Sequence, residues 1–128
     1  MQSMNHITVS GAPEGFDARL ILNEVAKSGG PVLHIARDDK RMAAMQAAIE
    51  YFDPSMAVVV FPAWDCLPYD RVSPNADISA ARMATLAGIV HGMPEKFVLL
   101  TTLNAATQKI PARSVLREAA FTAHVGSR

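Results

Sequence analysis

Residues 31–61 read PVLHIARDDKRMAAMQAAIEYFDPSMAVVVF, and this stretch indicates the fold class. Its two apolar runs, PVLHIA and MAVVVF, have the length of buried strands. The segment between them opens with Asp38, a residue type that often caps the start of a helix. Apolar residues then recur at helical spacing, at Met42, Met45, Ile49 and Phe52. Strands that are apolar on both sides predict a parallel sheet with helices on both faces.

The same alternation continues upstream and downstream of this stretch. Residues 6–9 (HITV) predict a strand, and a helix is expected to begin near Asp17 and to stop at a glycine pair. Residues 75–92 predict a helix that starts after Pro74, and residues 96–102 (KFVLLTT) predict another buried strand. Together these elements favour a doubly wound α/β domain. The residues of the later helix expected to face inward are Met83, Leu86, Ile89 and Val90.

The C-terminal part predicts a short helix over residues 103–109 and one more strand over residues 119–128 (AAFTAHVGSR). The length of 128 residues fits one domain, so residues 1–128 are expected to form a single lobe. Because the last strand has no visible continuation, we expect the chain to be cut from a longer protein at a domain boundary.

Composition excludes several classes of protein. Twelve basic residues balance twelve acidic ones, so charge indicates no polyanion as partner. A single cysteine, Cys66, excludes an internal disulfide and is either a small half-buried hydrophobe or a reactive thiol. The four histidines are too scattered for a zinc site. Neither a signal peptide nor a membrane-spanning run is present, which predicts a cytoplasmic protein without membrane partners.

Residues 11–18 (GAPEGFDA) occupy the place of a phosphate-binding loop, between the first predicted strand and helix. A working loop reads GxxxxGK[ST], whereas this chain has Phe16, Asp17 and Ala18 at the last three positions. Exchanging lysine for aspartate about 4 Å from a phosphate charge costs roughly 8 kcal/mol before screening. The loop is therefore predicted to bind no nucleotide and to catalyse nothing.

These loop residues have simpler structural roles. Gly11 and Gly15 are expected to permit a tight turn, and Asp17 to accept a backbone N–H at the start of the helix. Lys40 and Arg41 begin the next helix and are expected to extend into solvent.

Residues 62–86 (PAWDCLPYDRVSPNADISAARMATL) begin with three prolines in 13 positions, which impose an irregular but ordered path. Trp64 and Tyr69 could stack on nucleic-acid bases, or they could anchor this segment to its own domain. Arg71 and Arg82 could contact phosphate or a partner. Alternatively, Arg82 has an internal role and pairs with a nearby carboxylate, Asp70 or Asp77.

The same segment resembles the N-terminal region of the bacterial transcription-repair coupling factor family. The family pattern is W-x-x-L-P-Y-D-x-x-S-P, followed by a helix with S/A-x-R-x-x-T-L. The resemblance extends over roughly residues 7–125. The residues that carry the match are Trp64, Leu67, Pro68, Tyr69, Asp70, Ser73, Pro74, Arg82, Thr85 and Leu86.

The resemblance implies a RecA-like module, similar to the B subunit of the UvrABC excinuclease, whose ATPase motifs have degenerated. It implies a non-catalytic scaffold in transcription-coupled nucleotide excision repair. ATP and magnesium would belong to motor domains further along the parent chain. The segment after Tyr69 is too short for the DNA-opening hairpin of the excinuclease subunit, so no strand separation is expected.

The partners implied by the resemblance are other domains of the same chain and the excinuclease A subunit, the latter through a domain inserted just after this region. RNA polymerase and DNA would bind other parts of the parent. Two alternatives stay open: an ATPase lobe with an unusual loop, and a DNA-binding module that uses Trp64, Tyr69 and the nearby arginines.

Overall fold

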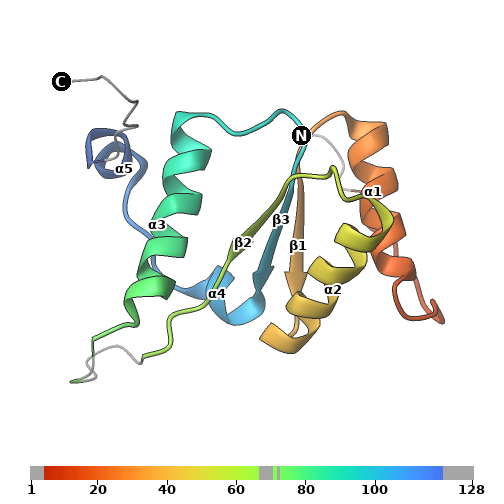
Figure 1. Cartoon of the computed structure of the whole chain (residues 1–128), viewed down its shortest axis with the longest axis horizontal. Coiled ribbons are helices and arrows are strands. Elements are labelled where there is room, and N and C mark those ends of the chain that lie inside the picture. Colours follow the sequence, from red (N-terminus) through yellow and green to blue (C-terminus); the bar gives the residue numbers. More distant parts are fainter. Residues whose placement is uncertain (1–4, 67–70, 72, 120–128) are drawn as a thin grey trace.

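A computed structural model describes residues 5–66, 71 and 73–119. The expected α/β class with a parallel sheet is confirmed, and helices lie on both sides of the sheet (Figure 1). The elements in chain order are α1 (Phe16–Ser28), β1 (Val32–Ala36), α2 (Asp39–Phe52), β2 (Val58–Phe61), α3 (Ala76–His91), β3 (Val98–Thr102), α4 (Leu103–Thr107) and α5 (Arg113–Ala119).

The sheet has the strand order β1-β3-β2, and both pairings are parallel. Val98 of β3 lies between Val32 of β1 and Val58 of β2, so the last of the described strands is the central one. The crossover from β1 to β2 passes over the position of β3, and the crossover from β2 to β3 returns in the opposite direction. Because both crossovers prefer the same right hand, α2 and α3 must lie on opposite faces. Figure 1 shows α1 and α2 together on one side of the sheet, and α3 with α5 on the other.

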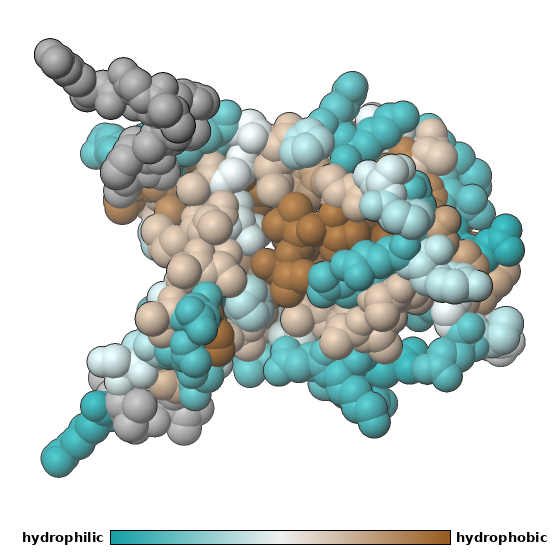
Figure 2. All heavy atoms as spheres, viewed as in Figure 1, coloured by the Kyte–Doolittle hydropathy of each residue, from teal (hydrophilic) through white to brown (hydrophobic). Residues whose placement is uncertain are grey.

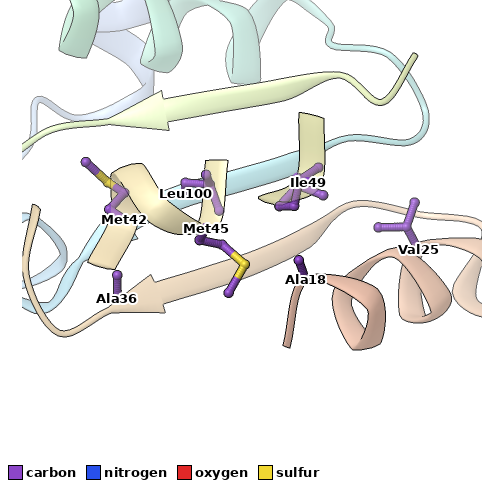
Figure 3. Packing of buried hydrophobic residues seen from close by; sticks show 8 residues of the cluster. Ala18, Val25, Ala36, Met42, Met45, Ile49 and Leu100 are labelled. Carbon is purple, nitrogen blue, oxygen red and sulfur yellow. The ribbon is translucent and has the colours of Figure 1, made fainter. Parts of the chain in front are cut away.

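The larger hydrophobic core lies between the sheet and the layer formed by α1 and α2. Figure 3 shows how side chains from these helices meet those of β1 and β3. Its buried members are Ala18, Val25, Ala36, Met42, Met45, Ile49, Val98 and Leu100. A smaller cluster on the other face contains Phe61, Leu86, Ala105 and Leu116. The apolar spacing that predicted α2 is confirmed for Met42, Met45 and Ile49, whereas Phe52 at the end of the helix is 44% exposed.

Local signals for helix starts and turns are confirmed. The Asp38 carboxylate accepts the Arg41 N–H at 2.8 Å, as expected of an N-cap. Gly11 and Gly15 have φ angles of 69° and 83°, a backbone conformation that residues with a Cβ atom rarely adopt. The tight turn before α1 therefore depends on glycine at both positions. Within the described residues, no helix has both the length and the apolar character needed to cross a membrane.

The strand predicted for residues 6–9 is wrong. This segment forms no ladder in the structure, and Ile7 and Val9 are 80% and 55% exposed. A β-rich run becomes a strand only where a neighbouring strand is available, and the described sheet places none beside it.

The inward face of α3 also differs from its prediction. Met83 and Ile89 are exposed, whereas Arg82 and Thr85 are buried beside Leu86. The helix is rotated so that a charged side chain, not a methionine, faces the sheet. The helix α5 was not predicted, because its short sequence buries a single large apolar residue, Leu116. The strand predicted over residues 119–128 starts at the end of α5 and otherwise lies outside the described residues.

Candidate functional site

The loop before α1 reaches the carboxyl end of β1, where ligands commonly bind in parallel α/β folds. An open cleft of about 410 Å³ lies there. A smaller neighbouring cleft includes Glu14 and Gly15. The larger cleft is lined by Asp17, His34, Ile35, Ala36, Arg37, Arg41 and Met45. The predicted loop and the natural ligand position therefore coincide.

Two backbone donors of this loop, those of Phe16 and Ala18, are already bonded within the loop. The Phe16 N–H donates to the Pro13 carbonyl at 3.1 Å. The Ala18 N–H donates to the Asp17 carboxylate at 3.0 Å, so the predicted role of Asp17 is confirmed. Asp17 stands in the first turn of α1, and the N-cap itself is Gly15. A phosphate group approaching this turn would meet a carboxylate and two N–H groups that are engaged elsewhere.

Arg41 is exposed, as expected, with a side chain that is 49% exposed, but it also faces acids of the loop before α1. Its guanidinium lies 3.7 Å from a Glu14 carboxylate oxygen and 4.0 Å from an Asp17 carboxylate oxygen. All three side chains are at least 44% exposed, so each pair contributes at most about 1 kcal/mol. The pairs nevertheless direct the cation of α2 toward two acids of the loop. Sequence spacing gave no signal for this arrangement, since the residues belong to different elements.

His34 lies in the same cleft, on the side of β1 that faces α1 and α2. Burial lowers the pKa of His34, the nearby Asp17 carboxylate raises it, and the Arg41 guanidinium lowers it again. The net direction is downward from 6.5, so His34 is neutral at pH 7. The pKa of Asp38 is also lowered, first by the Arg41 N–H and then by the Arg37 side chain.

These shifts predict a stability that falls in acid. Because folding lowers the pKa of His34, its contribution is fully present above pH 6.5 and is lost as the pH falls from 6.5 through the lower folded pKa. The free energy of unfolding should drop there by at most about 1.4 kcal/mol per pH unit. Thermal melts of the natural chain and of His34→Gln, compared from about pH 7.5 to 5.5, measure this. An identical decline in both proteins would assign the effect to other groups.

A second cluster surrounds the buried Arg82 and is called here the Arg82 cluster, comprising Phe61, Pro62, Trp64, Arg82 and Gln108. The Arg82 side chain is 1% exposed, and its guanidinium carbon lies 4.2 Å from the ring centre of Phe61 and 4.6 Å from that of Trp64. Its Nη1 atom donates to the Pro62 carbonyl at 2.7 Å and to Gln108 Oε1 at 3.2 Å. Burial lowers the pKa of Arg82. The charge is retained between two aromatic faces and two acceptors.

Side chains hold the end of β2 at three successive carbonyls. Thr85 Oγ1 donates to the Val60 carbonyl at 3.0 Å, and Thr101 Oγ1 donates to the Phe61 carbonyl at 2.9 Å. Arg82 Nη1 donates to the next carbonyl, that of Pro62. The Arg82 and Thr85 motif residues of α3 thus fix the direction in which the chain leaves the sheet.

A side chain also fixes the backbone at Trp64, because the backbone N–H of Trp64 donates to Gln108 Oε1 at 2.9 Å. Further along, the Asn75 N–H lies 3.2 Å from an Asp65 carboxylate oxygen and joins the two ends of the proline-rich segment. Between the two alternatives for Arg82, the geometry supports the internal one. Its described hydrogen bonds go to Pro62 and Gln108, not to Asp77.

The remaining predicted residues fall into two groups. Arg71, Ser73 and Pro74 are exposed, and Cys66 is half-buried. Leu67, Pro68, Tyr69 and Asp70 lie outside the described residues. Sequence reasoning missed Gln108, because nothing in its local sequence indicates a contact with α3. Among the described residues, no group of three or more His, Cys, Asp or Glu side chains could hold a metal ion.

No family model matches the chain. The chain is 30% identical over 113 residues to the transcription-repair-coupling factor of Escherichia coli K12, which covers 87% of this chain and 9% of that protein. The protein of the same name from Rickettsia bellii is 29% identical over 80 residues, with coverages of 62% and 7%. That from Haemophilus influenzae is 25% identical over 109 residues, with coverages of 85% and 9%.

The chain thus spans less than a tenth of the length of the curated relatives that it matches. These relatives share one name, which connects them with transcription and DNA repair. The chain is accordingly a relative, over most of its own length, of a segment of the transcription-repair coupling factors.

Proposed function

We propose that this chain is a RecA-like lobe without nucleotide chemistry, which serves as a scaffold and interaction domain in transcription-coupled nucleotide excision repair. The observation that carries the proposal is the bonding of the loop before α1. Its Phe16 and Ala18 N–H groups are engaged within the loop, and the Asp17 carboxylate stands at the cleft. The names of the relatives support the repair role.

The cleft residues do not fit a magnesium-bound triphosphate. Such a ligand needs a free cation near its terminal phosphates and a hydroxyl for the metal ion, and the loop offers Asp17 and Ala18 instead. Arg41 is the cation nearest the loop acids, and its charge is shared between Glu14 and Asp17. We therefore derive no catalytic step at this cleft.

Calorimetric titration with ATP and magnesium tests this proposal. We expect no saturable binding by the natural chain up to about 1 mM, which corresponds to a binding free energy weaker than about −4 kcal/mol. The variant Phe16→Gly, Asp17→Lys, Ala18→Thr restores the loop pattern and should gain measurable affinity. It replaces a repulsive charge with an attractive one and releases the Ala18 N–H.

A matched control separates loop chemistry from net charge. Glu24→Lys makes the same change of charge on an exposed position of α1, away from the cleft lining, and should gain nothing. Equal gains in the control and the loop variant would show nonspecific attraction. Binding by the natural chain at about 10 μM or tighter would overturn the proposal and make the domain a nucleotide-responsive one.

The proposed partners follow from the same assignment. Within a full-length coupling factor, the lobe would pack against other domains of its own chain. The motor, the RNA polymerase contact and the DNA contact would lie elsewhere, and an adjacent inserted domain would bind the excinuclease A subunit. High-affinity binding of that subunit by these 128 residues alone would contradict this placement.

A DNA-binding role through Trp64 is less well supported. The Trp64 ring packs on the Arg82 guanidinium and its backbone N–H is bonded to Gln108, which supports the role of Trp64 as an anchor for its own domain. The net charge of zero supplies no general attraction to phosphate. Titration with a DNA duplex at about 50 mM salt should give no binding, and salt-dependent binding there would favour the DNA-binding alternative.

A further inference from the structure

His34 occupies a position of β1 that faces the core. Val32 and Ala36, two residues before and after it, belong to or pack against the core formed with α1 and α2, and side chains two positions apart on a strand lie on the same face. Parallel strands between two helix layers normally carry apolar residues at such positions. The His34 ring is instead half-buried at the open cleft beside the end of β1. A titratable group therefore stands where packing alone requires none.

Charged side chains reach this ring from two helices and from its own strand. Asp17 of α1 and Arg41 of α2 act on His34 with opposite sign, and Arg37, which follows β1, lines the same cleft. Leu100, the residue opposite His34 in β3, brings no charge. Figure 2 shows hydrophilic side chains at the lower edge of the view, where β1 ends and α2 begins, in contrast to the hydrophobic surface between α2 and α3. The cleft is thus a site where charges from separate elements interact.

The Asp17 carboxylate is only partly engaged. Its Oδ1 atom accepts the Ala18 N–H at 3.0 Å. Its Oδ2 atom lies 4.0 Å from Arg41 Nη2, a separation that gives electrostatic attraction without a hydrogen bond. Arg41 also reaches a Glu14 carboxylate oxygen with Nη1 at 3.7 Å, so it connects the loop before α1 to α2 at two points. The Oδ2 atom is therefore open to a second cation.

We infer that His34 and Arg41 compete for the Asp17 carboxylate, so that protonation of His34 draws Asp17 toward β1 and loosens the loop before α1 from α2. At neutral pH the ring is uncharged and Arg41 holds the loop. In acid, a proton from solvent binds the ring, and the resulting cation attracts Asp17 and repels Arg41. This pH-sensitive switch goes beyond the proposed scaffold role and does not depend on it.

The ion pairs of the loop are weak enough to be redistributed by one new charge. Both pairs of Arg41 are long and exposed, so solvent screens them. A cation on His34 acts from a more buried position, where screening is less effective. Residues 11–14 are exposed, so little burial of loop side chains opposes a displacement. A single protonation can therefore change the position of the loop while the core stays packed.

Backbone ¹⁵N relaxation of the 128-residue chain tests the inference, at about pH 7.5 and about pH 5, on either side of the usual pKa of histidine. Amides of residues 14–18 should have order parameters near about 0.85 at the higher pH and fall toward about 0.6 at the lower pH. Amides of β3 should keep their values. Equal loop values at both pH settings would overturn the inference. A parallel loss of order in β3 would assign the change to unfolding and would overturn it as well.

Variants of the two competing charges should shift the pKa of His34 in opposite directions. Asp17→Asn removes the acid that raises this pKa and should lower it, whereas Arg41→Gln removes a cation that lowers this pKa and should raise it. Lys40→Gln removes the same charge one position earlier on α2, outside the cleft lining, and should leave the pKa of His34 unchanged. Titration of the ring resonances measures all three. Equal shifts in the arginine and lysine variants, or none in Asp17→Asn, would contradict the competition.

Two substitutions of His34 show whether the ring is required. His34→Leu supplies the apolar type that suits this face of the sheet, and His34→Gln keeps a polar side chain, so either variant that folds gives the answer. Neither side chain titrates, and the loop should keep the same order parameters at both pH values. A loop that still loosens in acid would make Glu14 or Asp17 the responsible group and would sink the inference. The ATP titration reads a different property, so the switch and the proposed function can fail separately.

Discussion

Arg82→Ala should destabilise the chain by about 3–4 kcal/mol, a large part of the roughly 5–15 kcal/mol that stabilises a typical domain. The substitution leaves a cavity between the rings of Phe61 and Trp64 and removes the donor to the Pro62 carbonyl. It also frees the segment after β2 from α3. Thermal unfolding should show a midpoint lowered by roughly 10 °C or more.

Two comparisons separate the packing of Arg82 from its charge. Arg82→Lys retains a cation but loses the flat group that fills the space between the rings, so it should recover only part of the lost stability. Arg37→Ala removes a guanidinium that is 83% exposed and should change the free energy of unfolding by less than about 0.5 kcal/mol. A melting temperature for Arg82→Ala close to that of Arg37→Ala would show that the Arg82 cluster contributes little.

Leu100→Ala is the second substitution with a large expected effect, a loss of about 3–5 kcal/mol. Leu100 is fully buried in the central strand β3 and belongs to the core formed with α1 and α2. Neighbours from several elements surround the side chain, so the cavity cannot easily close. Denaturant unfolding of the variant should show a lower midpoint with an unchanged slope.

Leu103→Ala provides the matched control, because it removes the same atoms three residues away. Leu103 is 61% exposed at the start of α4, and its truncation should cost less than about 1 kcal/mol. If both leucine variants lost the same stability, the burial of Leu100 in a central strand would not describe the folded chain.

Local chemistry explains which parts of the structure could be predicted from sequence. The Asp38 cap and the buried face of α2 depend on residues within a few positions of each other. Strand order depends on residues far apart in the sequence, since β3 occupies the central position through pairings with segments some 40 and 65 residues away. The sequence therefore predicted the strands after residue 30 but not their arrangement.

In the candidate site, too, local features could be predicted from the sequence and long-range contacts could not. The replacement of lysine by Asp17 was visible in the loop pattern, whereas the approach of Arg41 from α2 required the fold. Arg82 was recognised as a candidate for an internal role, but its partner Gln108 lies 26 residues further along. The strand predicted for residues 6–9 was wrong because β propensity does not ensure that a neighbouring strand is present to pair with.

The position of β3 has a consequence for how the chain is made. The first two strands emerge from the ribosome without their shared neighbour, and roughly 40 residues separate the end of β2 from the end of β3. At synthesis rates of about 5–20 residues per second, β2 waits roughly 2–8 s before it can pair, and β1, which ends earlier at Ala36, waits roughly 3–13 s. During that interval two apolar strands are exposed to other nascent chains. The order of translation, as much as the final packing, thus determines when this domain is most vulnerable to aggregation.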